Sequence, residues 1–357
     1  MAKTLLTLLL LLAAQLLPAQ QYRLLIGTYT GDGNASGAWL YRFDGATGES
    51  ARLDFAAARN PAFIIPSADR TRAWSVSESN DGRQGAYAYA LGADRLELLS
   101  YQVNCPSGKG SGNPCNILWF NGYILTADYF GGTVSIFPTA PDGTLEPLCK
   151  TFSFGPRSRM HCCRVSPDGK YIFASDLGCD VIRRFPVTAG GPLPVGEPDI
   201  AYQATPGSGP RHFIFSADGR FCYLLGELGD TLTVLRYEDG TLTPVQEIKA
   251  YRGRGKGSAD IHLSPDGRFL YTSHRLRGEG IAIFAVDPQD GRVRRAGFQR
   301  TGRHPRNFTL SPDGRWLLCA CRDDNAIQVY ARDAATGRLR LTDKTIRVNQ
   351  PVCVQLF

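Results

Sequence analysis

Ionisable side chains recur at fixed distances from a repeated turn in this sequence. His161, Arg211 and Arg306 lie five residues before the turn serine of their repeats, and Glu227 and Arg275 lie eleven residues after it. A histidine or glutamate can accept a proton as a general base. An arginine can bind an anion or stabilise developing negative charge through its planar fork of N–H donors. If the fold brings these positions together, they form a polar pocket suited to acid–base chemistry.

A short turn motif defines this spacing. It has the pattern Ser-(Pro or Ala)-Asp-(Gly or Arg), and its five copies begin at Ser67, Ser166, Ser216, Ser264 and Ser311. The last four begin 50, 48 and 47 residues apart, and the first interval of 99 residues has the abbreviated turn Trp119–Gly122 at its midpoint. Proline presets the first central φ of a tight turn and glycine accepts a positive φ, so each copy is expected to join two strands of a hairpin.

β-prone runs flank the turns. Tyr171–Ser175, Phe221–Leu225 and Phe269–Ser273 follow three of the turns, alternating runs such as Thr231–Leu235 come next, and no segment has a sustained helical period. A strand-rich repeat of this length is typical of propeller blades. We therefore predict an all-β fold, a seven-bladed β-propeller, six of whose blades begin near Pro61, Asn113, Arg159, Pro210, Ala259 and Pro305.

The remaining blade requires both ends of the chain. Leu24–Thr28 and Ala38–Arg42 are β-prone runs before the first repeat, and Val352–Leu356 is one after the last repeat. Pairing of these N- and C-terminal strands would close the ring and remove its exposed sheet edges. We expect residues 21–357 to form a single propeller domain closed in this way.

The hairpin geometry predicts which side chains meet. The strands before and after a turn are antiparallel, so residues remote from the turn on both strands emerge at one face, about 17 Å from the turn. This places the five ionisable residues above at one face around the axis, with Glu78 in its own repeat and Tyr129 in the shortened one. The alternative is a set of ion pairs that only stabilises the propeller, because charges near the axis are rarely left unpaired.

All five histidines of the chain lie in these blade segments. His161 shares the register of Arg211 and is the better candidate for chemistry. His212 and His262 differ in register, and we expect them to pack or hydrogen-bond between blades. The spacing of histidines and cysteines gives no metal-ligand pattern, so neither a metal nor a cofactor is predicted.

The first 20 residues are typical of a secretory signal peptide, with a charge at Lys3, an apolar run Leu5–Leu17, and cleavage after Ala19 or Gln20. The apolar run is too short for a membrane span. No cysteine precedes Cys105, which excludes a lipid anchor at the cleavage site. We expect a periplasmic or secreted protein without a stable membrane anchor, in which Cys105 and Cys115 could form a disulfide.

The net charge of +7 comes from basic and acidic residues that alternate along the chain. A nucleic-acid-binding protein would concentrate its basic residues on one face, so no nucleic-acid partner is expected. A mild positive balance is compatible with an acidic small molecule.

Several segments together resemble a family of seven-bladed lactonases, which includes bacterial 6-phosphogluconolactonases and fungal carboxymuconate-lactonising enzymes. The resemblance runs from Ile26–Thr30 to Pro351–Cys353 and is carried by Gly209–His212, Gly226–Leu228, Ile261–Gly267, Ser273–Arg275 and His304–Phe308. It implies the active-site set His161, Arg211, Glu227 and Arg275. The chain departs from the family pattern at four positions, with Gly226, His274 and Asp128 in place of Asn and Arg159 in place of His.

The resemblance implies a carboxylic ester hydrolase of carbohydrate and glucose metabolism, a lactonase that opens a sugar-acid lactone with water. The substrate would be 6-phosphogluconolactone or an unphosphorylated aldonolactone. Glu227 or His161 would be the general base, while Arg211 and Arg275 would stabilise the oxyanion or bind an acidic group. The remaining substrate contacts are expected from Arg306, Glu78, Tyr129 and His274.

Two other functions fit the same residues. One is a lactonising cycloisomerase acting on a muconate-type dicarboxylate, and the other is a non-catalytic exported propeller that binds a glycan or protein. The loop Tyr251–Gly257 is basic and could gather an anionic substrate, although a solvated loop explains it equally well. We expect a monomer whose partner is a small lactone.

Overall fold

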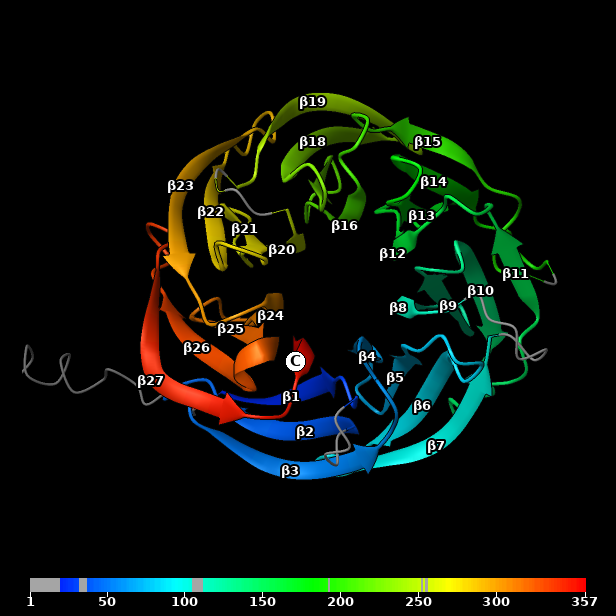
Figure 1. The fold of residues 1–357 in the computed structure, drawn as a ribbon, viewed down its shortest axis with the longest axis horizontal. Coiled ribbons are helices and arrows are strands. Elements are labelled where there is room, and N and C mark those ends of the chain that lie inside the picture. The colour runs from blue at the N-terminus through cyan, green and yellow to red at the C-terminus, as the bar shows by residue number, and fades with distance from the viewer. Residues whose placement is uncertain (1–19, 32–36, 105–111, 192, 252, 254–255) are drawn as a thin grey trace, which may run out of the picture.

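Seven antiparallel sheets of four strands surround a central axis (Figure 1). This arrangement confirms the predicted all-β, seven-bladed propeller. The computed structural model describes residues 20–31, 37–104, 112–191, 193–251, 253 and 256–357.

The first three blades share one layout, in which the innermost strand lies next to the axis (Figure 1). From the axis outward, their strands are β28 (Pro351–Leu356), β1 (Gln21–Thr28), β2 (Gly37–Asp44) and β3 (Ser50–Ala57) in blade 1; β4 (Ile64–Pro66), β5 (Arg72–Ser77), β6 (Gly85–Leu91) and β7 (Leu96–Val103) in blade 2; and β8 (Pro114–Phe120), β9 (Tyr123–Asp128), β10 (Thr133–Pro138) and β11 (Lys150–Ser153) in blade 3.

The other four blades repeat this layout with consecutive strands. They are β12 (Met160–Val165), β13 (Tyr171–Asp176), β14 (Val181–Pro186) and β15 (Asp199–Gln203) in blade 4; β16 (Pro210–Phe215), β17 (Phe221–Gly226), β18 (Thr231–Glu238) and β19 (Thr241–Lys249) in blade 5; β20 (Ser258–Leu263), β21 (Phe269–His274), β22 (Gly280–Val286) and β23 (Val293–Arg300) in blade 6; and β24 (Pro305–Leu310), β25 (Trp316–Cys321), β26 (Ala326–Arg332) and β27 (Leu339–Arg347) in blade 7, where the 3-10 helix η1 (Arg322–Asp324) follows β25.

The recurring Ser-Asp turn joins the two inner strands of its blade. In blade 4 the hydroxyl of Ser166 donates to Asp168 at 2.6 Å and accepts from the backbone N–H of Tyr171 at 3.0 Å. Gly169 closes the turn at φ 71°, a conformation in which a Cβ atom would be strained. The fourth turn residue of the first copy, Arg70, adopts the same positive φ of 61° without being glycine.

The ring is closed as predicted. β28 pairs antiparallel with β1, with Val354 opposite Ile26 and Leu356 opposite Leu24. β1 in turn pairs with β2. Strands from the two ends of the chain therefore form one blade, and the C-terminus lies beside the axis (Figure 1).

The apolar core lies between neighbouring blades. One cluster packs Phe173 and Ile182 of blade 4 against Phe213 and Leu235 of blade 5, and all four side chains are fully buried. Similar clusters fill the other interfaces around the ring. Full burial of one such side chain contributes about 1.5–3 kcal/mol, so the rigid contact between blades fixes the inner strands that carry the site.

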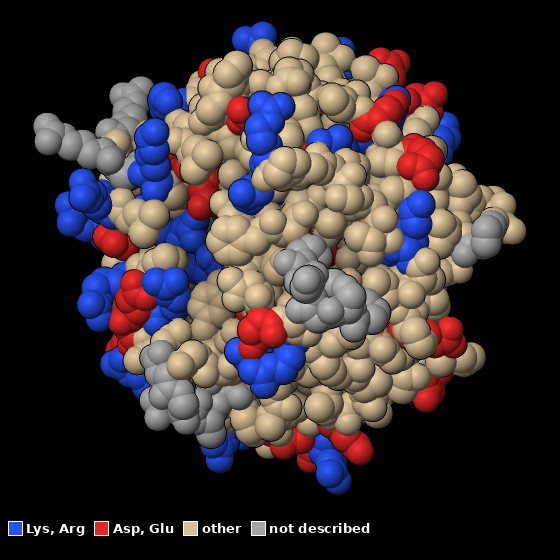
Figure 2. All heavy atoms as spheres, turned by 45° about the vertical axis from the view of Figure 1, so that its right-hand side comes forward, with Lys and Arg blue, Asp and Glu red and all other residues tan. Residues whose placement is uncertain are grey.

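Charged residues of both signs are interspersed over the face that Figure 2 shows. Within the described residues, no helix is long and apolar enough to cross a membrane. Residues 1–19 of the predicted signal peptide lie outside the described part of the chain. So does Cys105, while the nine described cysteines are free thiols and Cys115 is buried.

Candidate active site

The inner strands carry β-bulges where they begin, at the face opposite the turns. In β12, Met160 pairs with Asp176 and Cys162 pairs with Ser175, so His161 is left unpaired between them. The same irregularity surrounds Arg211 in β16 and Arg306 in β24. A bulge adds one residue to a strand and changes the direction of its side chain. The bulges of three different blades therefore place His161, Arg211 and Arg306 near the axis.

Glu227 is held between two arginines at the centre of the cluster. It directly follows β17, and its Oε2 accepts from Nε of Arg211 at 2.7 Å while its Oε1 accepts from Nη2 of Arg275, also at 2.7 Å. Arg211 also donates to the carbonyl of Ala259, and Arg275 donates to the carbonyl of Gly257 at 3.1 Å. The guanidiniums are nearly buried, with 2% and 5% of their side chains exposed, whereas Glu227 keeps 18% exposed.

Burial raises the pKa of Glu227, but the neighbouring positive charges, above all that of Arg211, outweigh burial and lower the pKa below its usual value. Burial and the repulsion from Arg211 lower the pKa of Arg275 to about 9. At neutral pH the carboxylate is therefore ionised, and both of its oxygens are engaged. Among the described residues, these contacts use two of the five N–H donors of each guanidinium, which leaves the others for a bound anion.

His161 faces this carboxylate across a short gap. Its Nε2 is 3.9 Å from Oε2 of Glu227, and its side chain is 4% exposed. Burial, followed by the positive charge of Arg211, holds the pKa of His161 well below its usual range. The imidazole is therefore neutral at physiological pH and able to accept a proton.

Arg306 and Glu78 form a second pair beside the first. Nη2 of Arg306 is 3.5 Å from Oε1 of Glu78, and its guanidinium lies over the ring of Tyr29 at 5.3 Å. The hydroxyl of Tyr29 donates to the same carboxylate oxygen at 2.8 Å. Tyr29 has no role predicted from the sequence, although it lies within the Ile26–Thr30 segment. Blade 1 lacks the Ser-Asp turn, so counting from turns could not reach this residue.

Tyr129 also joins the cluster. Its ring packs edge-on against His161, with centroids 5.7 Å apart. The preceding residue, Asp128, is fully buried and accepts hydrogen bonds from Thr133 at 2.7 Å and Ser135 at 2.9 Å. These contacts fix the end of β9 and thereby the position of the Tyr129 ring.

His274 makes its contacts within blade 6. Its Nδ1 is 3.0 Å from the hydroxyl of Ser258 and its Nε2 is 2.8 Å from the hydroxyl of Thr272, so both ring nitrogens are occupied. Its ring stacks on Tyr251 with centroids 5.0 Å apart. These contacts hold His274 at the end of β21, directly before Arg275. The basic loop to which Tyr251 belongs lies partly outside the described residues, at 252, 254 and 255.

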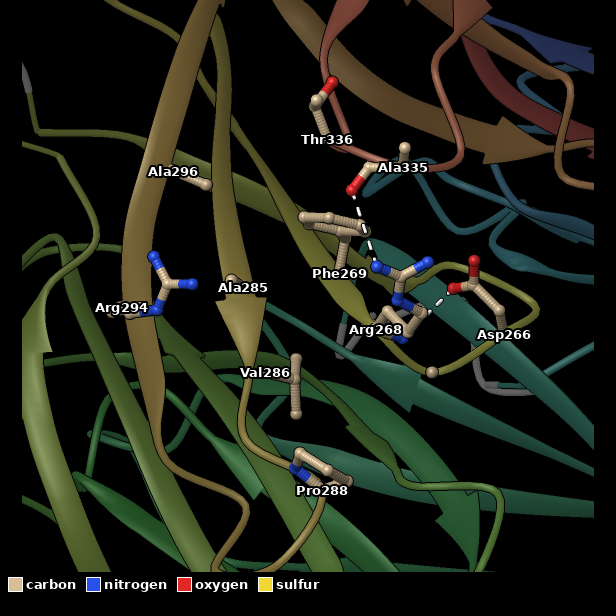
Figure 3. A pocket seen from close by; sticks show the side chains of 11 residues that line it. Asp266, Arg268, Phe269, Ala285, Val286, Pro288, Arg294, Ala296, Ala335 and Thr336 are labelled. Atoms are coloured by element: carbon tan, nitrogen blue, oxygen red, sulfur yellow. Dashed lines mark hydrogen bonds between the residues drawn. The ribbon is translucent and has the colours of Figure 1, made fainter.

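The face of the propeller that carries the Ser-Asp turns has surface hollows. Figure 3 shows one of about 380 Å³, lined by the turn Asp266–Phe269, by Ala285 and Val286, and by Ala335 and Thr336 of the next blade. It adjoins the turn, so it lies at the far end of the blade from Glu227. Among the described residues, no group of three His, Cys, Asp or Glu side chains is arranged to hold a metal ion.

A family model described as lactonase, 7-bladed β-propeller, matches residues 23–356 of this sequence. The chain belongs to this lactonase family.

Several proteins of similar length resemble this chain over almost their whole length. A 6-phosphogluconolactonase of Formosa agariphila is 30% identical over 93% of this chain and 98% of its own. A 6-phosphogluconolactonase of Bacillus subtilis is 30% identical over 93% of this chain and 97% of its own. The solved structure of the periplasmic gluconolactonase of Pseudomonas aeruginosa superimposes with a TM-score of 0.87 at 31% identity, covering 94% of this chain and 99% of that one. Lactonase activity is thus what the names of these relatives support, and they differ in whether the substrate carries phosphate.

Proposed function

We propose that this lactonase-family protein hydrolyses a sugar-acid lactone at the cluster around Glu227. The observation that carries the proposal is the neutral His161 facing a carboxylate whose two oxygens are held by Arg211 and Arg275. Ester hydrolysis by water is accelerated by a base that accepts the proton of the water and by cationic donors that stabilise the oxyanion.

The reaction can be written with these groups. A water that contacts His161 attacks the lactone carbonyl carbon, and its proton passes to Nε2 while the carbonyl electrons move to oxygen. The guanidinium donors of Arg211 and Arg275 stabilise this oxyanion. Collapse of the intermediate breaks the ring C–O bond, and His161 returns the proton to the leaving oxygen. The product is the open-chain hydroxy acid. Glu227 orients both arginines, and because both of its oxygens already accept hydrogen bonds from them it is the weaker candidate for the base.

The charge of the site favours an acidic group on the substrate or product. Arg211, Arg275 and Arg306 bring three positive charges, while Glu227 and Glu78 bring two negative ones. One positive charge remains in excess, which suits the carboxylate product and equally a phosphate. Export through residues 1–20, together with the periplasmic relative, favours an unphosphorylated aldonolactone.

A pH-stat assay tests this function. Purified mature protein is supplied with glucono-δ-lactone, its 6-phosphate and a muconolactone, and acid release is compared with the spontaneous rate. We expect acceleration with a sugar-acid lactone. Arg211→Ala should abolish it, whereas Arg220→Ala should not, because Arg220 is an exposed residue of the opposite face paired with Asp218. If no lactone is opened faster than in buffer, the proposed function is wrong.

A further inference from the structure

A buried polar layer lies directly behind the site residues. The residue after Arg211 in β16 is His212, and the corresponding residue of β20 is Asp260. Nδ1 of His212 is 2.7 Å from Oδ1 of Asp260, and the two side chains are 5% and 4% exposed. This contact links blade 5 to blade 6, as expected for a histidine outside the register of His161.

The contacts of Asp260 determine which atom carries the proton. Its Oδ2 accepts from the amide of Asn307 at 2.5 Å and from the backbone N–H of Phe308 at 3.2 Å, and it lies 3.0 Å from Nε2 of His262. Backbone and amide N–H groups can only donate, so Oδ2 of Asp260 is an acceptor. Burial raises the pKa of this carboxyl, but its contacts with His262 and His212 lower the pKa well below its usual range, so Oδ1 is unprotonated as well. His212 must then donate from Nδ1, and as a neutral ring it presents a lone pair at Nε2.

Two histidine rings in contact behind the cluster each have a buried nitrogen without a partner among the described residues. Within the described part of the chain, neither Nε2 of His212 nor Nδ1 of His161 has a hydrogen-bond partner. The two rings are in edge contact, with centroids 5.2 Å apart and an interplanar angle of 71°. Buried polar atoms without a partner are rare in proteins, and a buried water can satisfy polar groups that lack one.

We propose that Asp260 and His212 are positioning residues for His161, through a hydrogen-bonded chain that ends at its Nδ1. In this chain His161 donates from Nδ1 through one water to Nε2 of His212, which itself donates from Nδ1 to Asp260. The lone pair of His161 is then fixed at Nε2, the atom that faces Glu227. The catalytic purpose of the chain rests on the proposed function, in which Nε2 takes the proton of the attacking water.

The chain has a second consequence during the reaction. When His161 becomes an imidazolium, its Nδ1–H strengthens the link to His212, and the carboxylate of Asp260 stabilises the positive charge at the far end. A carboxylate behind a catalytic imidazole acts in this way in serine hydrolases, where it sets the tautomer without itself taking the proton. Here a second imidazole lies between the carboxylate and the base.

The tautomers can be measured without any substrate. Protein labelled with ¹⁵N-histidine has only five imidazoles, so replacing each in turn assigns the ring signals in long-range ¹H–¹⁵N spectra. We expect both His161 and His212 to be protonated at Nδ1 and unprotonated at Nε2. Asp260→Asn should reverse the tautomer of His212 and disturb that of His161, with a loss in kcat of about 100-fold and an unchanged KM.

Three further variants separate positioning from packing. His212→Gln keeps a polar group near the Nε2 position and should retain more activity than His212→Asn, which keeps only the contact with Asp260. His262→Gln is the matched control, because it removes a contact of Asp260 but leaves the chain to His161 intact, so kcat and the His161 tautomer should not change.

The outcomes distinguish the two proposals. If the protein opens lactones while His161 is protonated at Nε2, the chain is wrong and the proposed function stands. The chain is equally wrong if Asp260→Asn folds and leaves the His161 tautomer as it was. If the tautomers are as expected but no lactone is hydrolysed, the proposed function fails, and with it the catalytic purpose of the chain.

Discussion

Glu227 and His161 have different roles in the structure, although the sequence alone makes either of them a candidate for the general base. Both are candidate bases by residue type, yet one is ionised and held by two guanidiniums, and the other is neutral and lacks a partner at Nδ1 among the described residues. A carboxylate that compensates two buried cations stabilises the fold, because removing it leaves those charges unpaired. A neutral histidine at the edge of such a pair has no comparable structural duty.

This difference predicts separate effects for two substitutions. His161→Gln should lower kcat by about 10²–10⁴-fold, the usual contribution of a general base, and change the free energy of unfolding little. Glu227→Gln should lower activity as well, and should also reduce the free energy of unfolding by about 3 kcal/mol because Arg211 and Arg275 lose their counter-charge. Urea unfolding and pH-stat kinetics measure the two effects.

Glu247→Gln serves as the control for Glu227→Gln. Glu247 is an exposed residue of an outer strand whose carboxylate accepts from Thr205 at 2.9 Å and Thr233 at 3.1 Å. Its substitution should change stability by no more than about 0.5 kcal/mol and leave kcat unaltered. Equal stability of the Glu227 and Glu247 variants would contradict the compensating role of Glu227.

The sequence predicted these site residues because the turn serine of each repeat is a fixed reference point from which residues can be counted. Each turn serine lies at a constant distance from the opposite face, so counting reached His161, Arg211 and Glu227 without coordinates. The link between His212 and Asp260 could not be counted, because it joins two blades and depends on the curvature of the ring. His274, predicted as a substrate contact, hydrogen-bonds to Ser258 and Thr272 of its own blade, and its contact with a substrate stays a prediction.

At the scale of the elements, two adjacent residues of an inner strand can point to different surroundings, one to the candidate site and the other to a neighbouring blade. In β24 the bulge residue Arg306 contributes to the site, and the next residue, Asn307, donates to Asp260 of the preceding blade and accepts from Val354 of the following one. In β8 the residue after the bulge, Asn116, accepts from the backbone N–H of Cys163 in the next blade. In β24 the bulge therefore separates a residue of the candidate site from a residue that joins neighbouring blades.

The turns at the other end of the inner strands can be tested with two substitutions that should change the free energy of unfolding in opposite directions. Arg70 occupies the left-handed position that glycine takes in the other copies. Burial, and then repulsion from Arg70, lowers the pKa of Arg23. Arg70→Gly should therefore raise the free energy of unfolding by about 0.5 kcal/mol, after the entropic cost of glycine is subtracted. Urea unfolding monitored by circular dichroism measures the change.

The reciprocal variant is Gly267→Ala. Gly267 adopts φ +68° and a Cβ added there would meet nothing within 4 Å, so only backbone strain opposes the change. We expect a loss of about 1 kcal/mol. Destabilisation by Arg70→Gly would show that the side chain of Arg70, and not its backbone conformation, decides the stability of that turn.

At the scale of the whole molecule, the propeller is a closed ring whose last strand completes both the core and the polar layer. Val354 of β28 is fully buried between blades 1 and 7, and its backbone N–H donates to Asn307 at 2.7 Å. Cys353 lies beside it with its thiol against the carbonyl of Ile64 in blade 2. The C-terminal strand thus contacts the blades on both sides, and β28 covers the inner edge of β1.

Closure by β28 predicts a large difference between two neighbouring positions of that strand. Val354→Asp places an unpaired carboxylate in a fully buried apolar site and should reduce the free energy of unfolding by about 4 kcal/mol. Gln355→Asp changes the adjacent, partly exposed residue of the same strand and should cost about 1 kcal/mol or less. Urea midpoints give the stabilities, and size-exclusion chromatography detects association through the edge of β1 if β28 detaches.

Because β28 lies against the axis next to the site, Val354→Asp should also lose lactonase activity at urea concentrations where Gln355→Asp retains it. Similar midpoints for the two variants would mean that the ring tolerates a detached C-terminal strand, and closure would then have no part in holding the site together.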